Sequence, residues 1–311
     1  MTRARVAVVG GTGMLGSMLV DVLGRADGLV LIATARSSEA ASSQYPRLPG
    51  VEWHVLDVGT RETTLFGLEA LGAIDWYINA IGIIKPYIRD ENPGEVERAI
   101  RVNSQFPFDL ARFAGDRGAR VIQFATDCVY AGTRGRYLES DRHDSLDVYG
   151  KTKSLGEARL DHVHLLRCSF VGPEPKSYVS LLEWFRRQPR GAQANGFTNH
   201  VWNGVTTLHI ARICAGIIRE NLELPTLQHV VPAEVVNKAE LLQMFARHFD
   251  RSDITIRPVE ASVPIDRSLD TENANLNGVL WRAAGCEAPP GINAMIAELA
   301  QHEYAFAGPT A

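Results

Sequence analysis

The chain has 311 residues, of which 45% are hydrophobic and 22% are charged, with 27 glycines and 15 prolines. This is the composition of a globular protein, so collagen-like, low-complexity and wholly disordered classes are excluded. The net charge of −4, from 32 basic and 36 acidic residues, provides no basic surface for a phosphate backbone, and we expect no nucleic-acid partner.

The first half of the chain alternates strand-like apolar runs with helix-like patterns. Strands are predicted at 5–10, 29–34, 52–57, 75–80, 120–125 and 163–168, and helices at 14–25, 62–71, 94–117 and 148–160. Short apolar strands that alternate with helices are typical of a parallel sheet buried on both faces. The pattern therefore predicts a Rossmann-like, doubly wound α/β domain.

The second half of the chain has a looser rhythm that prolines interrupt. Helices are predicted at 178–187, 207–220, 238–249 and 292–302. We expect a dinucleotide-binding domain of residues 1–171 and 205–232, and a smaller C-terminal α/β substrate-binding lobe of residues 172–204 and 233–311. A ligand is expected between these two lobes.

The apolar runs are of strand length, whereas a membrane-spanning helix needs ~20 apolar residues, so no membrane partner is expected. The N-terminal run leads into glycines and not into a small-residue cleavage site, which favours a first strand over a signal peptide. The four cysteines show no metal-ligand spacing, which favours a reducing cytoplasm. His162 and His164 would share one face of a strand, but no third ligand stands near them, so no metal site is predicted.

A glycine-rich turn follows the first predicted strand and opens the first helix. Glycines there permit a tight turn, let the backbone approach a pyrophosphate and let the helix pack closely on the sheet. The N–H groups of the helix's first turn would face the anion. An ordinary strand–turn–helix is the alternative, but the position at the first βα junction favours a dinucleotide site. The cofactor contacts predicted from this turn are Gly10, Thr12, Gly13, Met14, Leu15 and Gly16.

Arg36 and Ser37 follow the second strand, with no acidic residue before Glu39. A carboxylate at this place is typical of NAD sites, whereas an arginine accommodates the 2′-phosphate of NADP. We therefore predict NADP(H) rather than NAD(H); a solvated surface charge is the alternative for Arg36. Further cofactor contacts are expected after the third and fourth strands, although a helix cap and a routine turn are the alternatives there: Asp57, Val58, Asn79, Ala80 and Ile81.

Tyr149 and Lys153 are one helical turn apart, so their side chains share a face. An ammonium so close is expected to lower the pKa of the phenol from ~10, which would let Tyr149 exchange a proton with a substrate oxygen. Lys153 can also bind a ribose hydroxyl, so both residues count as cofactor contacts. A Tyr–Lys pair alone is common on exposed helices, but Thr126 ends the fifth strand, where ligands of open α/β sheets bind. These three residues are the predicted catalytic set.

The sequence resembles the extended short-chain dehydrogenase/reductases that act on nucleotide sugars, and among them the dTDP-4-dehydrorhamnose reductase-like branch. The resemblance lies in residues 9–16, 125–132, 137–141 and 146–157, with weaker support from 166–172 and 203–207. It implies an NAD(P)H-dependent reductase of a keto group on a nucleotide-activated deoxysugar, with Thr126, Tyr149 and Lys153 as catalytic residues. It also implies a structural role for Asn103 near the active site.

Three other activities are weighed against ketone reduction. The 4,6-dehydratases that the chain resembles carry Thr-Asp-Glu, whereas Cys128 follows Asp127 here, which disfavours dehydration. Cys128 matches a cysteine of GDP-fucose-synthase-like epimerase/reductases, where a thiol could abstract a proton alpha to a ketone; a small buried apolar side chain is the alternative. No histidine stands in 172–181 as the second acid, so reduction is placed above epimerisation. A non-catalytic NAD(P)-binding regulatory subunit, like that of methionine adenosyltransferase, is the alternative from another class.

The substrate region departs from the Asp-Gln-x-Gly-x-Pro-Thr run of this branch, which leaves the sugar and its carrier open. For the aromatic and polar residues at 197–203, packing between the lobes is the alternative, and for Arg267 a surface salt bridge. A nucleotide sugar is the expected partner, and a homodimer is left open. The predicted substrate contacts are Lys85, Cys128, Phe197, His200, Trp202, Asn203 and Arg267.

Overall fold

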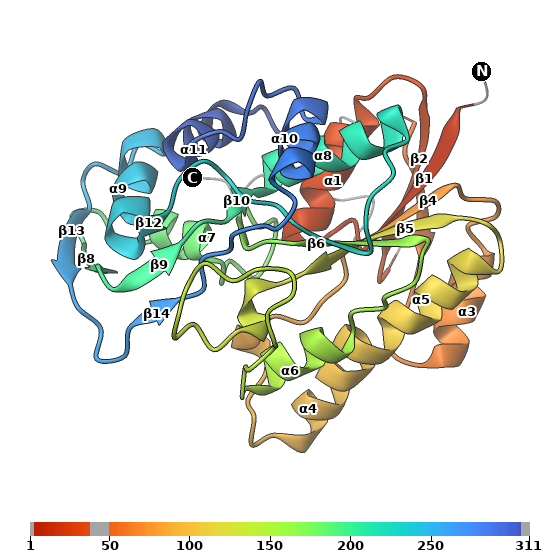
Figure 1. Ribbon diagram of the computed structural model, residues 1–311, viewed down its shortest axis with the longest axis horizontal. Helices are drawn as coiled ribbons and strands as arrows, with labels where there is room; N and C mark the ends of the chain where they lie inside the picture. Colours follow the sequence, from red (N-terminus) through yellow and green to blue (C-terminus); the bar gives the residue numbers. More distant parts are fainter. Residues whose placement is uncertain (1–2, 38–49, 306–311) are drawn as a thin grey trace.

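The computed structural model describes residues 3–37 and 50–305. Its centre is a seven-stranded parallel sheet in the order β11-β6-β5-β4-β1-β2-β3, seen edge-on in Figure 1. The strand order reverses between β1 and β4, which is the switch point where doubly wound folds bind ligands. The strands are β1 (Ala4–Val9), β2 (Leu29–Ala35), β3 (Glu52–Val55), β4 (Trp76–Asn79), β5 (Arg120–Ala125), β6 (Val163–Arg167) and β11 (Leu227–His229).

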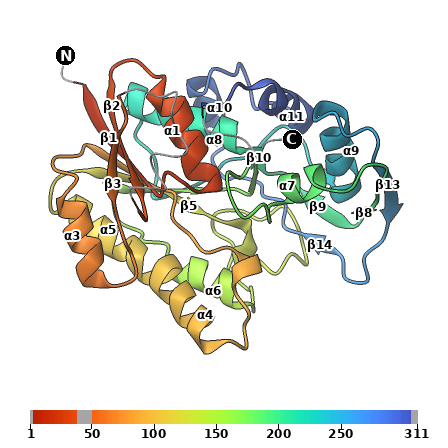
Figure 2. The ribbon, with the colours of Figure 1, turned by 180° about the vertical axis from the view of Figure 1, so that it is seen from behind.

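Helices cover both faces of this sheet, because its strands are apolar on both sides. Along β1, Val6 and Val8 pack in one apolar cluster, whereas Ala7 and Val9 pack in the other. One face carries α1 (Met14–Gly24), α8 (Thr207–Glu220) and α10 (Ala274–Ala283); the other carries α3 (Arg61–Glu69), α4 (Pro93–Ala99), α5 (Phe106–Gly115) and α6 (Val148–Leu155) (Figure 2). The prediction of a Rossmann-like, doubly wound α/β fold is confirmed.

The single helix predicted over 94–117 is wrong in its middle. Between α4 and α5 the chain forms a π-helical segment, η2 (Ile100–Gln105). Pro107 stands in the first turn of α5 and has no N–H to donate to the carbonyl of Asn103, so the regular ladder is interrupted there. The wide turn directs Asn103 toward the loop after β4, where its side chain bonds both backbone groups of Ile83, at 2.8 and 2.9 Å.

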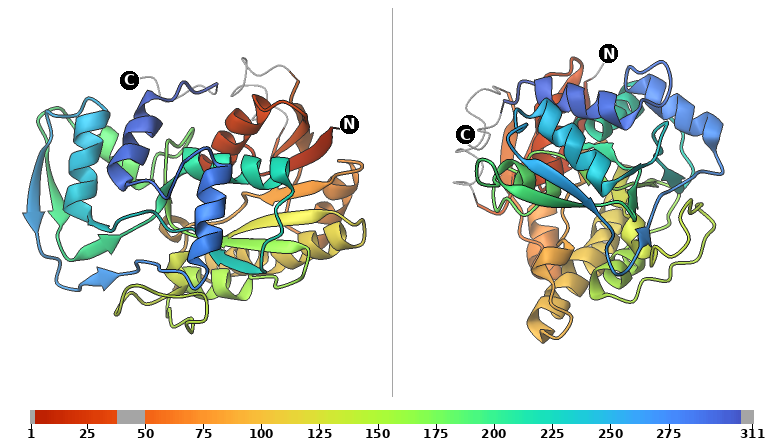
Figure 3. Two further views of the ribbon diagram at one scale, coloured as in Figure 1. Left: turned by 45° about the horizontal axis from the view of Figure 1, so that its top comes forward. Right: turned by 90° about the vertical axis from the view of Figure 1, so that its left-hand side faces the viewer.

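The second lobe consists of small sheets and short helices, which gather at one end of the molecule in Figure 3. Its strands are short, and each sheet joins segments that are distant in the sequence. The strand pairs are β7 (Phe170–Val171) with β10 (Val205–Thr206), β8 (Gln193–Phe197) with β13 (Thr255–Val259), and β9 (His200–Trp202) with both β12 (Val236–Asn237) and β14 (Ile265–Asp266). The helices are α7 (Leu181–Arg186), α9 (Lys238–His248) and α11 (Ile292–Gln301).

Residues 205–232 return to the large sheet. Helix α8 packs on α1, and β11 pairs with β6 in parallel, with Leu227 opposite Leu165. The apolar cluster that contains Val6 and Leu15 continues into Phe245 and Met295, so both lobes share one core. The lobe boundaries given above stay a prediction. Among the described helices, none has the length and apolar character to cross a membrane.

Candidate active site

The glycine turn between β1 and α1 has the conformation that its sequence predicts. Gly10 lies at φ +91°, and its N–H donates to Thr34 Oγ1 at 2.9 Å. A Cβ on Gly16 would lie 2.0 Å from the carbonyl oxygen of Gly10, so only glycine fits there. Gly13 is the N-cap of α1 and brings no side-chain cap, and the first turn has no acidic residue. The start of α1 is therefore suited to an anionic ligand.

A Cβ on Gly13 would meet only the oxygen of Gly10, at 3.8 Å, an ordinary contact. The protein itself thus does not require glycine at this position. A side chain there would instead occupy the space above the turn, next to the buried Thr12. This supports the predicted approach of a pyrophosphate to the backbone.

The other predicted cofactor residues lie at the same carboxyl edge of the sheet. Arg36 and Ser37 follow β2 and are exposed. The turn after β4 is fixed by Asn79, whose Oδ1 accepts from the N–H of Ile81 at 3.1 Å, while Ala80 donates to Val9. The parallel topology thus brings these loops beside the glycine turn.

Asp57 and Val58 form the corresponding loop after β3. Asp57 is exposed and accepts from the N–H of Gly59 at 3.0 Å. Helix α3 is capped by Thr60, so the alternative of Asp57 as the helix cap does not hold. Val58 is buried, and its carbonyl accepts from Arg101 at 3.0 Å.

Thr126 and Tyr149 meet at the end of β5. Thr126 Oγ1 donates to Asp127 Oδ1 at 3.1 Å and accepts from the N–H of Cys128 at 3.2 Å. Tyr149 lies close to Thr126, because Thr126, Asp127 and Cys128 all affect the pKa of its phenol. Helix α6 positions Tyr149 because Asp147 caps its start, where Oδ1 accepts from the N–H of Gly150 at 2.8 Å.

The expected acidification of Tyr149 by Lys153 is wrong for this structure. Burial raises the pKa of Tyr149 above its ordinary value, and Cys128 and Asp127 raise it further, while the neighbouring Thr126 side chain lowers it. The ammonium of Lys153 donates to the backbone oxygen of Phe124 at 2.9 Å, and burial lowers the pKa of Lys153 to about 8. Burial is the largest influence on the phenol, so Tyr149 keeps its proton at neutral pH.

Burial also shifts the pKa values of Asp127 and Cys128, which follow Thr126 in the chain. Burial raises the pKa of the Asp127 carboxyl, which Arg267 and Lys238 partly offset. Burial and the charge of Asp127 raise the pKa of Cys128 to about 12. The thiol is therefore a poor base at neutral pH. Burial likewise raises the pKa of the three other cysteines, Cys168, Cys214 and Cys286.

Lys238 is a residue of this site that sequence reasoning missed. It begins α9 of the second lobe and lies 5.9 Å over the ring of Trp202. Burial lowers its pKa, while Asp127 and Cys128 raise it, which places the ammonium near the reacting edge. No motif marks this lysine, because only the folding of α9 onto the larger lobe brings it there.

Two of the predicted substrate residues lie beside the catalytic group. Arg267 donates from Nε to the carbonyl oxygen of Tyr130 at 2.8 Å, and its charge lowers the pKa of both Asp127 and Cys128. Lys85 is mostly exposed and forms a 2.7 Å ion pair with Asp147, the cap of α6.

The four predicted residues at 197–203 are engaged in contacts with other residues of the chain, in the second lobe and, for Trp202, at Ser169 of the first. Trp202 is buried and donates to Ser169 Oγ at 2.9 Å, and Asn203 bonds both backbone groups of Leu269, at 2.7 and 2.9 Å. The rings of Phe197 and His200 lie 4.8 Å apart, and His200 Nε2 contacts the carbonyl of Val263 at 3.0 Å. Within the described residues, these contacts are those of a packing loop, and none joins the four to Thr126, Tyr149 or Lys153.

A buried ionic network supports the end of α6, and sequence reasoning missed it. Arg167 of β6 is fully buried and is ion-paired with Glu157, just after the helix. The same guanidinium donates to Tyr130 Oη at 2.8 Å and contacts the imidazoles of His143 and His229, at 2.9 and 3.0 Å. Because Tyr149 and Lys153 lie on α6, this network helps to fix the catalytic helix.

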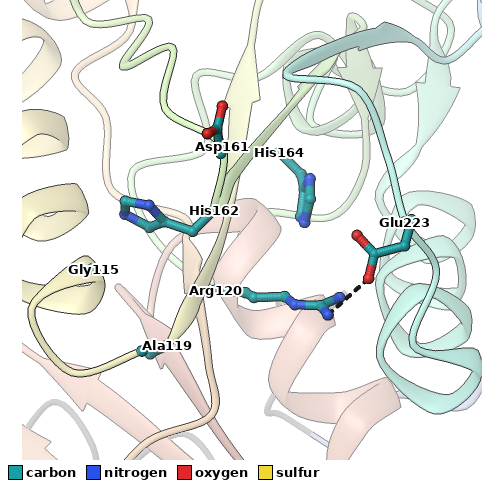
Figure 4. A pocket seen from close by; sticks show the side chains of 8 residues that line it. Gly115, Ala119, Arg120, Asp161, His162, His164 and Glu223 are labelled. Carbon is teal, nitrogen blue, oxygen red and sulfur yellow. Dashed lines mark hydrogen bonds and ion pairs between the residues drawn. The ribbon is translucent and has the colours of Figure 1, made fainter.

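The two histidines considered as metal ligands diverge. His162 precedes β6 and its Nε2 contacts the carbonyl of Ala111 at 2.8 Å, whereas His164 lies against the ring of Trp76. Both line a cavity of about 300 Å³ that also contains Arg120, paired with Glu223 (Figure 4). The cavity lies at the amino ends of β5 and β6, opposite the catalytic edge. In the described part of the chain, no cluster of residues could hold a metal ion.

A family model described as the RmlD substrate binding domain matches residues 4–304. The chain belongs to this family. Among curated relatives, the probable low-salt glycan biosynthesis reductase Agl14 of Haloferax volcanii is 31% identical over 169 residues, which are 53% of this chain and 52% of the relative. The dTDP-4-dehydrorhamnose reductase of Salmonella typhimurium is 38% identical over 72 residues, 23% of this chain and 24% of that protein. The RmlD-family chain thus spans about half the length of these curated relatives, or less.

Solved structures show the same fold over almost the whole chain. The dTDP-4-dehydrorhamnose reductase of Bacillus anthracis in complex with NADP has a TM-score of 0.71 at 16% identity, and 96% of this chain and 98% of that one are covered. The Bordetella bronchiseptica enzyme WbmG in complex with NAD and UDP has a TM-score of 0.72 at 16% identity, with 96% and 93% covered. The predicted resemblance to this branch is thereby confirmed.

Proposed function

We propose that the protein is a reductase that uses NADP(H) in preference to NAD(H) to reduce a keto group on a nucleotide-activated deoxysugar, as in dTDP-4-dehydrorhamnose reductases. The proximity of Tyr149 to Thr126, at the same carboxyl edge of the parallel sheet as the glycine turn, carries this proposal. The family and the two named relatives, both described as reductases, support it. A cytoplasmic location and a homodimer stay predictions.

The dinucleotide supplies hydride when it is bound at the glycine turn. Tyr149 then gives its phenolic proton to the oxygen of the reduced carbonyl, and Thr126 stabilises the developing alkoxide with a second hydrogen bond. Tyr149 is protonated at neutral pH, so its phenol has a proton to give when the hydride arrives. Lys153 would exchange its bond to Phe124 for a ribose hydroxyl and so position the nicotinamide.

The protonation state of Cys128 supports reduction over epimerisation. Epimerisation needs a base beside the ketone, and Cys128 is the candidate for it. With its pKa raised to about 12, this thiol does not supply a thiolate at neutral pH. The preference for NADP(H) is supported by Arg36 at the end of β2 and by the NADP found in the Bacillus anthracis relative.

Replacement of Tyr149 by phenylalanine tests the proposed function. Loss of the proton donor is expected to lower turnover by about 10²–10⁴-fold, measured as NADPH oxidation with a panel of 4-keto nucleotide sugars. The control is Tyr87→Phe, which changes a partly exposed tyrosine of η1 (Lys85–Tyr87) and should retain activity.

Full turnover by Tyr149→Phe would refute the catalytic assignment. Wild-type protein that binds NADPH tightly but never oxidises it, with any sugar of the panel, would instead favour a regulatory subunit. Exchange of substrate stereochemistry without net NADPH consumption would favour an epimerase.

A further inference from the structure

A lysine of the second lobe lies on the glycine turn of the first. After β7 the chain enters the segment 172–180, and Lys176 of this segment donates from Nζ to Thr12 Oγ1 at 3.1 Å. Thr12 stands between Gly10 and Gly13, in the turn that the proposed dinucleotide occupies. This cation is 164 positions distant from the turn in sequence, and no sequence pattern assigns it to the cofactor.

The backbone around Lys176 is held in an unusual conformation. The two residues that follow it, Ser177 and Tyr178, both lie in the left-handed region, at φ 70° and 52°. Non-glycine residues persist there only where their surroundings hold them. Tyr178 Oη donates to the carbonyl of Pro175 at 3.3 Å, and the guanidinium of Arg187 lies 3.4 Å from the centre of its ring. The loop is therefore fixed to α7, and Lys176 is at its tip.

A second cation, Arg36, approaches from the end of β2. Burial lowers the pKa of Lys176, the charge of Arg36 lowers it further, and Glu174 raises it. Arg36 follows β2, whose Thr34 carbonyl accepts from the N–H of Gly11 at 2.8 Å, so Arg36 and Lys176 both lie beside the glycine turn. Within residues 3–37 and 50–305, neither forms an ion pair with a carboxylate, and the carboxylate of Glu174 accepts from the N–H of Ser180 at 2.9 Å. In that described part of the chain, two cations beside one turn and without an ion-paired carboxylate provide a site for an anion.

We propose that Lys176 and Arg36, one from each lobe, bind the 2′-phosphate of NADP(H), with the Thr12 hydroxyl as a further contact. This rests on the proposed function, which places the dinucleotide at the glycine turn. The pyrophosphate, common to both dinucleotides, belongs to the N-terminus of α1, whereas the adenosine ribose lies at the end of β2, beside Arg36. The substrate lobe thereby takes part in choosing the cofactor.

The test compares ligands that differ only in this phosphate. Dissociation constants for NADPH, NADH, adenosine 2′,5′-bisphosphate and adenosine 5′-monophosphate are measured by titration calorimetry with wild-type protein, Lys176→Met and Lys176→Arg. We expect Lys176→Met to raise the dissociation constants of NADPH and of the bisphosphate by about 10- to 100-fold, because a charge-assisted bond is lost. The dissociation constants of NADH and the monophosphate should change by less than about twofold. Lys176→Arg should keep most of the wild-type preference for the ligands that carry the 2′-phosphate. Lys151→Met, on the exposed side of α6, is the matched control.

Equal weakening of NADPH and NADH by Lys176→Met would refute the assignment to the 2′-phosphate, and unchanged binding of NADPH would refute it as well. A wild-type protein that binds NADH as tightly as NADPH would also overturn this inference, while the reductase function would stand. A wild-type protein that binds neither dinucleotide would overturn the proposed function itself.

Discussion

The carboxyl edge of the large sheet and the loop at 197–203 carry similar polar side chains but use them differently. At the sheet edge, Thr126 and Tyr149 lie close together where the strands of the parallel sheet end. In the loop, Trp202 and Asn203 are bonded to Ser169 and Leu269 of the same chain. The bonds of Trp202 and Asn203 join segments that are distant in the sequence, whereas those of Thr126 stay within its own turn. The loop therefore links parts of the fold, and the variants below test whether it also binds substrate.

The buried network beneath the catalytic helix should give the largest effect on stability. Arg167→Met removes the only fully buried cation that pairs with Glu157 among the described residues and leaves Glu157 the half-exposed Arg159, so the free energy of unfolding should fall by about 3–5 kcal/mol, measured by urea denaturation. The control is Arg89→Met, which breaks an exposed ion pair with Glu95 and should change little. Equal losses for the two variants would mean that the network does not fix α6.

The glycine turn offers a pair of variants that separates folding from cofactor binding. Gly16→Ala drives a Cβ into the oxygen of Gly10 and should cost about 1–3 kcal/mol of stability. Gly13→Ala makes no such close contact and should leave the melting temperature nearly unchanged. It should nevertheless raise the dissociation constant for NADPH by at least about tenfold. If Gly13→Ala binds NADPH like the wild type, the pyrophosphate does not approach the turn as proposed.

The smallest effects are expected in the second lobe, where they test its structural role. Asn203→Ala leaves two backbone groups of Leu269 without partners and should lower stability by about 1–3 kcal/mol. His200→Ala should change stability by less than about 0.5 kcal/mol. In both variants the KM for the sugar nucleotide should stay close to the wild-type value. A rise in KM for Asn203→Ala without loss of stability would show that Asn203 contacts the substrate.

The large lobe was predictable because its topology follows from periodicity. Apolar runs such as 120–125 predict buried parallel strands, and their carboxyl ends must then converge, which brings Thr126 near the glycine turn. The interruption of 94–117 was missed because the break depends on Pro107 and on the loop that Asn103 binds, and neither alters the apolar pattern. Helix α10 was missed as well, although its Trp281 is buried against α8.

The site was predictable from sequence only where its residues lie in short segments with a recognisable spacing. Thr126, Tyr149 and Lys153 lie within two short segments, so spacing alone could group them. Lys176 and Lys238 reach the site from the second lobe, and their positions depend on how α7 and α9 pack. The prediction of a lowered pKa for Tyr149 is wrong for the same reason. The spacing of Tyr149 and Lys153 on a helix does not tell how deeply the phenol is buried, and burial raises its pKa.

The four thiols, two buried (Cys168, Cys214) and two partly exposed (Cys128, Cys286), have a practical consequence for the handling of the protein. Alkylation and disulfide exchange proceed through the thiolate, and burial raises the pKa of every cysteine in the chain. Iodoacetamide at neutral pH should therefore label the folded chain slowly and the urea-unfolded chain quickly. The chain thus carries its own reporter of unfolding, which needs no engineered label.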